Sequence, residues 1–271
     1  MGLNCAEFVR AKAPNNGEDF MLFRTEGEQE WAISQPMHAW ISGQLLRDWD
    51  EALPESLLLA AEQHDHAWTD WELNPTFDGQ SGRPLLFRNV GAALHAPMWA
   101  AGVERALHNW GSHVALLLSR HGGTIYKRFT TRHQLSEADA AAARAYLETQ
   151  APREAAWARA LGLADAELAR QSSLIAVVDT LSLVLCGELA APLEIEALDA
   201  GGKAHVLRMT PIEGSPYEFA LSPWPFRSAR LNLEGEARPM PKGGRFADEA
   251  AMRDWLENAP RVRFGASLKQ G

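Results

Sequence analysis

The spacing of apolar residues changes once along the chain, near residue 190. Before that point apolar residues recur every three or four positions, as they do on the buried face of a helix. After Pro192 the segments LEIEAL, AHVLRMT, YEFALS and ARLNLEG alternate apolar and polar residues, which is typical of half-buried strands. The first part of the chain is therefore predicted to be helical and the last part to form a sheet.

Capping signals, Pro and Gly set the expected bounds of these elements. The predicted helices occupy 34–50, 54–64, 91–109, 112–121, a stretch that starts at 136, 165–189 and a short segment at 246–258. A hairpin is expected at 20–33, a long loop at 74–89 and a final strand in RVRFGASL.

This order of elements predicts a mainly α fold. We expect a helical bundle with a small antiparallel β-sheet, formed by the C-terminal part and the N-terminal hairpin. The chain would be a single compact unit over 1–271, with a helical core at 34–190 and a strand-rich extension at 191–271.

Composition narrows the class of protein without indicating an activity. The formal net charge of the 271 residues is −9, so the overall charge attracts neither nucleic acid nor anionic lipid. The longest apolar run, 174–186, is interrupted by Asp179 and is too short to span a bilayer. Cys5 and Cys186 form no disulfide scaffold, and the N-terminus lacks the apolar stretch of a signal peptide. We expect a cytoplasmic protein with no nucleic-acid or membrane partner, of undetermined oligomeric state.

Asp179 is the most informative single residue. It lies in SSLIAVVDTLSLVLC, a highly apolar predicted helix, and no basic residue lies within one turn of it. An isolated carboxylate in an apolar interior is costly unless it is paired or bound to a metal. Its partner is either a metal ion or an Arg, a Trp N–H or a His from another helix.

His38, His64 and Asp65 offer the remaining ligands for a metal. His64 and Asp65 are adjacent near the end of one predicted helix, and His38 lies on the helix before it. Neutral imidazole supplies a nitrogen ligand and carboxylate an oxygen ligand, a combination that suits iron, manganese or zinc. Together with Asp179, these residues favour a metal site over a purely structural pair.

The order His38, His64-Asp65, Asp179 resembles the H…HD…D signature of the HD superfamily of metal-dependent phosphohydrolases. This resemblance implies an HD-type helical bundle that holds one or two divalent metal ions. It also implies that Asp65 bridges the ions where there are two.

HD proteins with two metals carry two further histidines between the HD pair and the last Asp. His95 and His121 are the natural candidates, each on a predicted helix, and His113 is the alternative to His95. Because His113 and His121 are eight positions apart, they lie on somewhat different faces of one helix. A pair with one histidine from each of two helices, His95 and His121, is the simpler arrangement for binding one metal.

A closer resemblance covers the chain from about Trp31 to Pro241. The phrases QPMHAWISGQL, HDHAWTDWELNP, GRPLLF, LLLSRHG, DTLSLVLC and PWPF look like an uncharacterised bacterial family catalogued as domain of unknown function 3891. The likeness implies the same HD-like helical bundle, and no established activity comes with it. Many HD hydrolases continue the pair as HD-x-G-K, whereas HDHAW lacks the Lys that aids phosphate chemistry, which counts against a phosphohydrolase.

Four residues are candidates for catalysis near the metal. Besides the bridging role of Asp65, His66 would act as a hydrogen-bond donor behind the ligands or as a proton shuttle. Arg83 and Arg120 would bind an anionic substrate. The alternatives are an ordinary salt bridge for either Arg and a core or surface imidazole for His66.

Three functions are compatible with these residues. The first is a hydrolase in which a metal-activated water attacks a phosphoester or another small anionic substrate. The second is a di-iron oxygenase, because some HD proteins use the same ligand set with dioxygen and because tryptophans adjoin the predicted site. The third is a non-catalytic, metal-stabilised binding or sensory module. The partner expected for either enzyme is a small molecule.

Overall fold

The computed structural model describes residues 22–85, 87–132, 135–187, 189 and 191–271, so Cys5 and the N-terminal segment lie outside the described part. The helices are α1 Gln35–Arg47, α2 Glu55–Glu62, α3 Thr69–Leu73, α4 Ala92–Trp110, α5 Ser112–Arg132, α6 Glu137–Leu161, α7 Asp165–Cys186 and α8 Glu249–Asn258, with short 3-10 turns η2 His66–Trp68 and η3 Phe87–Asn89. The strands are β1 Leu22–Glu26, β2 Gln29–Ile33, β3 Phe77–Asp78, β4 Arg83–Pro84, β5 Leu193–Leu198, β6 Ala204–Ile212, β7 Ser215–Ser222, β8 Arg230–Pro241 and β9 Val262–Gln270.

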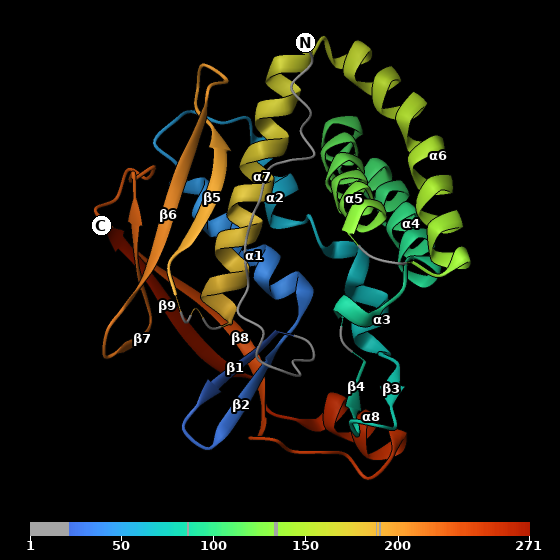
Figure 1. Ribbon diagram of the computed structural model, residues 1–271, viewed down its shortest axis with the longest axis vertical. Coiled ribbons are helices and arrows are strands. Elements are labelled where there is room, and N and C mark those ends of the chain that lie inside the picture. Colours follow the sequence, from blue (N-terminus) through green and yellow to red (C-terminus); the bar gives the residue numbers. More distant parts are fainter. Residues whose placement is uncertain (1–21, 86, 133–134, 188, 190) are drawn as a thin grey trace.

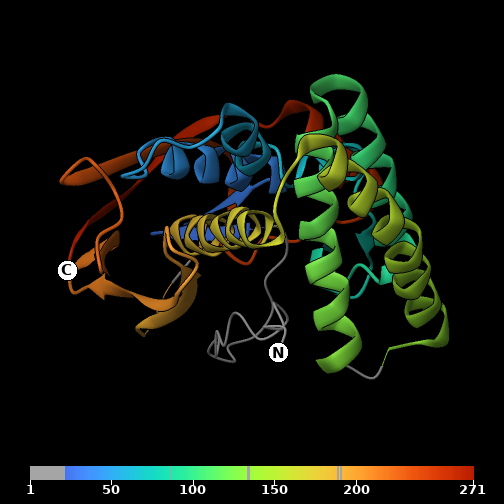
Figure 2. The same ribbon diagram turned by 90° about the horizontal axis from the view of Figure 1, so that it is seen from above.

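The long helices form two groups. α4, α5 and α6 pack side by side, while α1, α2 and α7 pack together next to the large sheet (Figures 1 and 2). Local signals fix the ends of α6: the Ser136 side chain accepts a hydrogen bond from the Asp139 N–H, and Gly162 ends the helix in the left-handed conformation. Because α2 and α7 also contact α5, the two groups meet along one seam.

The sheet is larger than the sequence predicted. Seven strands lie in the order β1-β2-β8-β9-β7-β6-β5, and the β7–β9 pair is parallel while the other pairs are antiparallel. Figure 1 shows this sheet curling around the side of α1 and α7. The prediction of a mainly α, HD-type helical bundle with a small antiparallel β-sheet is therefore wrong, because a large mixed sheet is a principal part of the architecture.

Long-range strand pairing is the reason for this error. The hairpin β1–β2 joins the sheet through β2–β8, where Ala32 pairs with Arg238, and β9 inserts between β8 and β7. The alternation of apolar and polar residues predicts a strand but not its neighbours, which are distant in the sequence. The loop expected at 74–89 also contains a small hairpin, β3–β4, in which Asp78 pairs with Arg83.

α7 lies at the centre of the fold. It packs against α1, α5 and β5, and its residues Leu174, Val178 and Leu181 are buried. By length and composition α7 would also suit a membrane-crossing helix, yet 56% of its most apolar window is buried inside the protein. The apolar composition of α7 is therefore explained by its position as a core helix of a soluble protein.

Candidate metal centre

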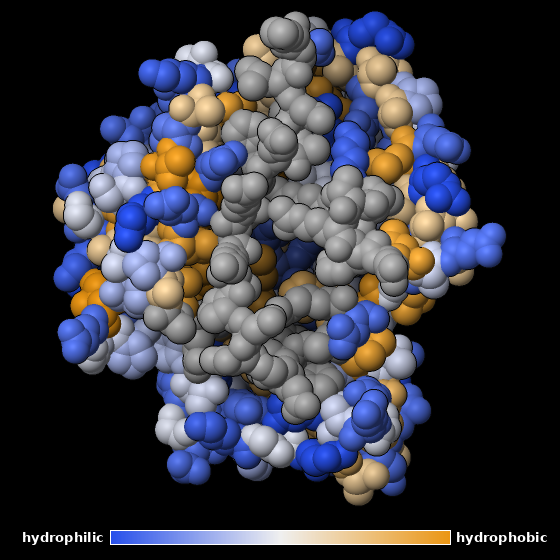
Figure 3. Space-filling view, viewed as in Figure 1, coloured by the Kyte–Doolittle hydropathy of each residue, from blue (hydrophilic) through white to orange (hydrophobic). Residues whose placement is uncertain are grey.

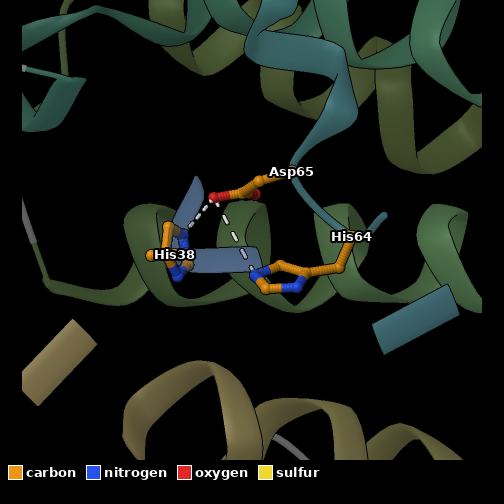
Figure 4. Close-up of side chains that lie close together, drawn as sticks. All are labelled: His38, His64 and Asp65. Atoms are coloured by element: carbon orange, nitrogen blue, oxygen red, sulfur yellow. Dashed lines mark hydrogen bonds and ion pairs between the residues drawn. The ribbon is translucent and has the colours of Figure 1, made fainter. Parts of the chain in front are cut away.

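Five of the predicted ligands come together where α1, α2, α5 and α7 meet. His38 comes from α1, His64 and Asp65 from the turn after α2, His121 from α5 and Asp179 from the middle of α7. Figure 4 shows the rings of His38 and His64 reaching the carboxylate of Asp65 from separate segments. Two groups of ligand atoms result: His38, His64 and Asp65, and His64, His121 and Asp179.

The distances within this cluster suit metal coordination. His38 Nε2 is 2.7 Å and His64 Nε2 is 3.9 Å from Asp65 Oδ2. His64 Nε2 is 3.3 Å from Asp179 Oδ1, and His121 Nε2 is 4.0 Å from Asp179 Oδ2. Two atoms that bind one ion at about 2.1 Å lie about 3 to 4 Å apart. Small shifts of these side chains would therefore be enough to bind an ion.

His64 gives the strongest sign that a cation belongs here. Its Nδ1 donates to the carbonyl oxygen of Ala61 at 2.8 Å, so Nε2 of the neutral ring carries a lone pair. That Nε2 is buried and makes no hydrogen bond, although Asp179 Oδ1 is 3.3 Å away. In the neutral ring this buried atom lacks a hydrogen-bond partner, which is costly. A proton directed at Asp179, or a divalent metal ion, would satisfy it.

The charges around His64 also favour a cation. Burial lowers the pKa of His64, but Asp65 and Asp179 raise it, to about 9 in total. Burial raises the pKa of Asp65 and of Asp179, yet the neighbouring histidines lower the pKa of each below its usual value. Both carboxylates are therefore ionised at neutral pH, and the negative field that favours a proton on His64 would equally favour a metal ion.

His95 lies near this cluster without belonging to either group of ligand atoms. Its ring packs against Trp68 and Trp99, with centroids 4.7 and 5.0 Å away, and Trp99 also contacts the ring of His121 at 5.8 Å. His95 Nδ1 is 2.7 Å from the Tyr126 hydroxyl, and its Nε2 is buried without a hydrogen bond. Because burial lowers the pKa of His95 to about 4, the ring is neutral and able to bind a metal.

His113, the predicted alternative to His95, has a structural role. Its Nδ1 lies 2.7 Å from the Ser56 hydroxyl, and its Nε2 lies 2.7 Å from Gln171 Oε1. Since the amide oxygen only accepts, Nε2 donates to Gln171 and Nδ1 accepts from Ser56. Both ring nitrogens are occupied, which leaves His95 as the better ligand candidate.

His66 and Arg83, two of the predicted catalytic residues, make other contacts. His66 is on η2, where its ring meets Trp110 edge-on at 5.1 Å. Arg83 is buried, forms an ion pair with Glu30 at 2.6 Å and donates to the carbonyl oxygen of Gly244 at 2.7 Å. These contacts give His66 a packing role against α4 and give Arg83 a role in joining β4 to β2 and to the loop after β8.

A cavity of about 30 Å³ lies between α5 and α7, beside Asp179 and His121. That volume holds about two water molecules, and it explains why the Asp179 side chain keeps 22% exposure. The other lining residues are Leu117, Thr124, Ile125, Ser172, Ile175 and Ala176. Ser172 accepts a hydrogen bond from Arg120 Nε at 3.0 Å, which links Arg120 to this lining. Figure 3 shows hydrophilic atoms in the same part of the view as the seam between α7 and α5.

Two buried hydroxyls behind His38 were not predicted from the sequence. Ser182 Oγ is 2.9 Å from His38 Nδ1, and Ser42 Oγ is 2.9 Å from Ser182 Oγ. A signal for both was present. Ser42 follows His38 by four positions and Ser182 follows Asp179 by three, so each shares a helix face with a candidate ligand.

Comparison with known proteins gives a family without an activity. A family model described as protein of unknown function (DUF3891) matches residues 21–242, a range that contains every candidate ligand. No curated protein and no solved structure matches the chain. The resemblance to this uncharacterised family is thus confirmed, whereas membership of the HD superfamily is not. Because the match covers most of the chain, the protein belongs to the DUF3891 family.

Proposed function

We propose that the protein is a metal-dependent hydrolase that acts on a phosphoester or a related small anionic substrate. The observation that carries this proposal is the buried Nε2 of His64, which lies beside ionised Asp179 and makes no hydrogen bond. The ligand order His38, His64-Asp65, Asp179 also supports it, and a relationship to the HD superfamily is part of the proposal. The protein would act in the cytoplasm.

The residues present fit one or two divalent ions of iron, manganese or zinc. His38, His64, Asp65 and Asp179 would hold one ion, because the ligand atoms of His38, His64 and Asp65 lie together and His64 also lies 3.3 Å from Asp179 Oδ1. His121, which groups with His64 and Asp179, and His95 would serve a second ion. A bound ion would lower the pKa of a water molecule and polarise the substrate oxygen that undergoes attack.

Arg120 would bind the anionic substrate. Its side chain is 29% exposed, and its NH1 is 4.0 Å from Glu154 Oε2, a long ion pair that an anionic substrate could replace. Its Nε contact with Ser172 links the guanidinium to the lining of the cavity. The ionised carboxylate of Asp179 lines the same cavity and can accept a proton from a water molecule there.

The cavity itself favours a second candidate, a di-iron oxygenase. At about 30 Å³, with Leu117, Ile125 and Ile175 in its wall and neither Lys nor Arg among its lining residues, it suits a molecule the size of dioxygen better than a phosphate group. Aromatic side chains around His95 add to this observation. The ligand set itself is compatible with iron.

The test uses the full chain, stripped with a chelator and reloaded separately with manganese, zinc or ferrous iron. Hydrolysis of bis(p-nitrophenyl) phosphate and consumption of dissolved oxygen are measured on each form. The proposal predicts hydrolysis that Asp179→Asn abolishes and that Arg120→Ala weakens mainly through KM. Arg144→Ala, which removes an exposed cation on α6, is the control and should leave hydrolysis unchanged.

The outcomes separate the two candidates. Oxygen consumption by the iron form without hydrolysis by any form would replace the hydrolase with the oxygenase. Metal-loaded protein without either activity, on these and a wider set of phosphoesters, would contradict both enzymes.

A further inference from the structure

Ser182 lies directly behind His38, on the side of the ring that faces away from Asp65. Its Oγ is 2.9 Å from His38 Nδ1, while His38 Nε2 lies 2.7 Å from Asp65 Oδ2. His38 and Ser182 both have no measurable exposure. Asp179 Oδ1 is farther from Nδ1, at 4.0 Å. Ser182 is therefore the direct hydrogen-bond partner of the ligand candidate His38.

The Ser182 hydroxyl has two possible hydrogen-bond acceptors. It lies 2.8 Å from the carbonyl oxygen of Asp179, one turn back on α7, and 2.9 Å from His38 Nδ1. A carbonyl oxygen only accepts, whereas an imidazole nitrogen donates or accepts according to its tautomer. Two hydrogen-bond arrangements therefore fit the same positions of the heavy atoms.

In the first arrangement Ser182 donates to His38 Nδ1, and His38 Nε2 carries the proton and donates to Asp65. This arrangement suits the metal-free protein, because both ring nitrogens then have partners. In the second arrangement Ser182 donates to the Asp179 carbonyl oxygen and accepts from His38 Nδ1. The lone pair of Nε2 then faces Asp65 Oδ2 with no proton between them, an arrangement that a metal ion would stabilise.

We propose that Ser182 is a positioning residue that sets the tautomer of His38, by turning its hydroxyl from His38 to the Asp179 carbonyl oxygen when a metal binds. This inference rests on the proposed metal centre and assigns it a residue outside the ligand set. One proton leaves Nε2 and one is taken up at Nδ1, so the number of protons on the ring does not change. The buried hydroxyl has an acceptor in both arrangements, so the exchange leaves no hydroxyl proton unpaired.

Ser42 provides a matched control, because its described hydrogen bonds go to the same network and not to His38. Its hydroxyl lies 3.1 Å from the Val178 carbonyl oxygen and 2.9 Å from Ser182 Oγ, and it is as deeply buried as Ser182. Replacing either serine by alanine removes one buried hydroxyl. Only the change at Ser182 removes the partner of His38 Nδ1.

The first test measures zinc affinity by competition with a chelator on the full chain. Loss of a hydrogen-bond partner behind a metal ligand weakens metal binding by about 10–100-fold, and this loss is expected for Ser182→Ala. Ser182→Thr, which keeps the hydroxyl, should restore most of the affinity, and Ser42→Ala should change it by less than about threefold. Equal affinities for Ser182→Ala and Ser42→Ala would overturn the proposal.

A second test reads the tautomer of His38 in the wild-type protein and uses a variant only to assign the signals. The nitrogen chemical shifts of His38 in 15N-labelled protein, assigned with His38→Gln, report which ring nitrogen carries the proton. The proposal predicts a proton on Nε2 without metal and on Nδ1 with zinc. A proton on Nδ1 in both forms would overturn the switch while leaving the metal centre intact. Wild-type protein that binds no zinc, manganese or iron would instead remove the proposed function, and this inference with it.

Discussion

The two histidines of α5 lie in opposite environments. At the start of the helix, His113 has both ring nitrogens hydrogen-bonded, one to Ser56 and the other to Gln171. About two turns later, His121 faces a cluster of charged groups. In that cluster His64 Nε2 is buried without a hydrogen bond.

This difference separates a structural histidine from a candidate ligand. Around His113, neutral groups satisfy the donor and the acceptor of the ring, so nothing further is needed there. Around His64, two ionised carboxylates face a buried nitrogen that makes no hydrogen bond in the neutral ring. A protein interior tolerates ionised carboxylates beside a buried imidazole nitrogen when a cation balances their charge.

Removal of each ring gives the largest expected contrast. His64→Ala should lower metal affinity by more than about 100-fold, since even a hydrogen-bond partner behind a ligand contributes about 10–100-fold. His113→Ala should leave metal affinity unchanged, because both its nitrogens are occupied. Equilibrium dialysis against zinc measures both. A similar loss in the two variants would remove the distinction between these histidines.

The stability of the metal-free protein should depend on His113, although its metal affinity should not. His113→Ala leaves the Gln171 amide oxygen and the Ser56 hydroxyl without their shared partner, which should cost about 1–3 kcal/mol of the free energy of unfolding. Urea unfolding of the metal-free protein measures the loss, and Ser56→Ala should reproduce part of it. A cost below about 0.5 kcal/mol would mean that the hydrogen bonds of His113 are not structural.

The pH dependence of the metal-free protein isolates the charge on His64. Its pKa is raised from 6.5 to about 9, so the protonated ring stabilises the fold fully below pH 6.5. That stabilisation is lost as the pH rises through 9. The free energy of unfolding should therefore fall between pH 6.5 and 9 in the wild type and change less in His64→Ala. Parallel pH profiles for the two proteins would contradict the assigned charge.

Glu72 tests whether every unpartnered buried atom indicates a cation. Its Oε1 accepts from the Gln35 N–H at 2.8 Å, while its Oε2 is buried without a partner. Burial raises the pKa of Glu72 from 4.5 to about 7, because the hydrogen bond from the Gln35 N–H and the nearby Arg238 offset only part of the burial cost. Its ionised form thus destabilises the fold, and the stability lost increases as the pH rises from 4.5 through 7.

Glu72→Gln should therefore stabilise the metal-free protein on the order of 1–2 kcal/mol at pH 8. At pH 4.5 the variant and the wild type should be nearly equal, because Glu72 is then protonated. Urea unfolding at the two pH values is the measurement. A variant less stable than the wild type at pH 8 would show that the Glu72 carboxylate has a cationic partner, as the His64 cluster is proposed to have.

The cluster was largely predictable because burial of a charge leaves a local signal. Asp179 interrupts an apolar helix, and that interruption directed attention to His38 and His64. The direction of a side chain is less visible in the sequence: His66 follows Asp65 directly, yet η2 turns its ring to Trp110. Arg83 was predicted as a substrate ligand because the sequence does not reveal its ion pair with Glu30.

The sheet was predictable strand by strand and not as a whole. The alternation in β5 to β9 indicated the strands, but the pairing of β2 with β8 joins segments about 200 residues apart. The parallel pair β7–β9 has no local signature either. Hence the helical bundle with a small sheet was the wrong architecture even though most of its elements were anticipated.

The central claim is that the His64–Asp179 cluster holds a metal, and elemental analysis tests it most directly. The full chain is purified without chelator next to Asp179→Asn, which removes the charge and keeps the size of the side chain. One or two divalent ions per wild-type chain, with most of this content lost in a variant that retains its circular dichroism, is the predicted result. No metal in the wild type after exposure to iron, manganese and zinc, or equal metal in both proteins, would contradict the claim.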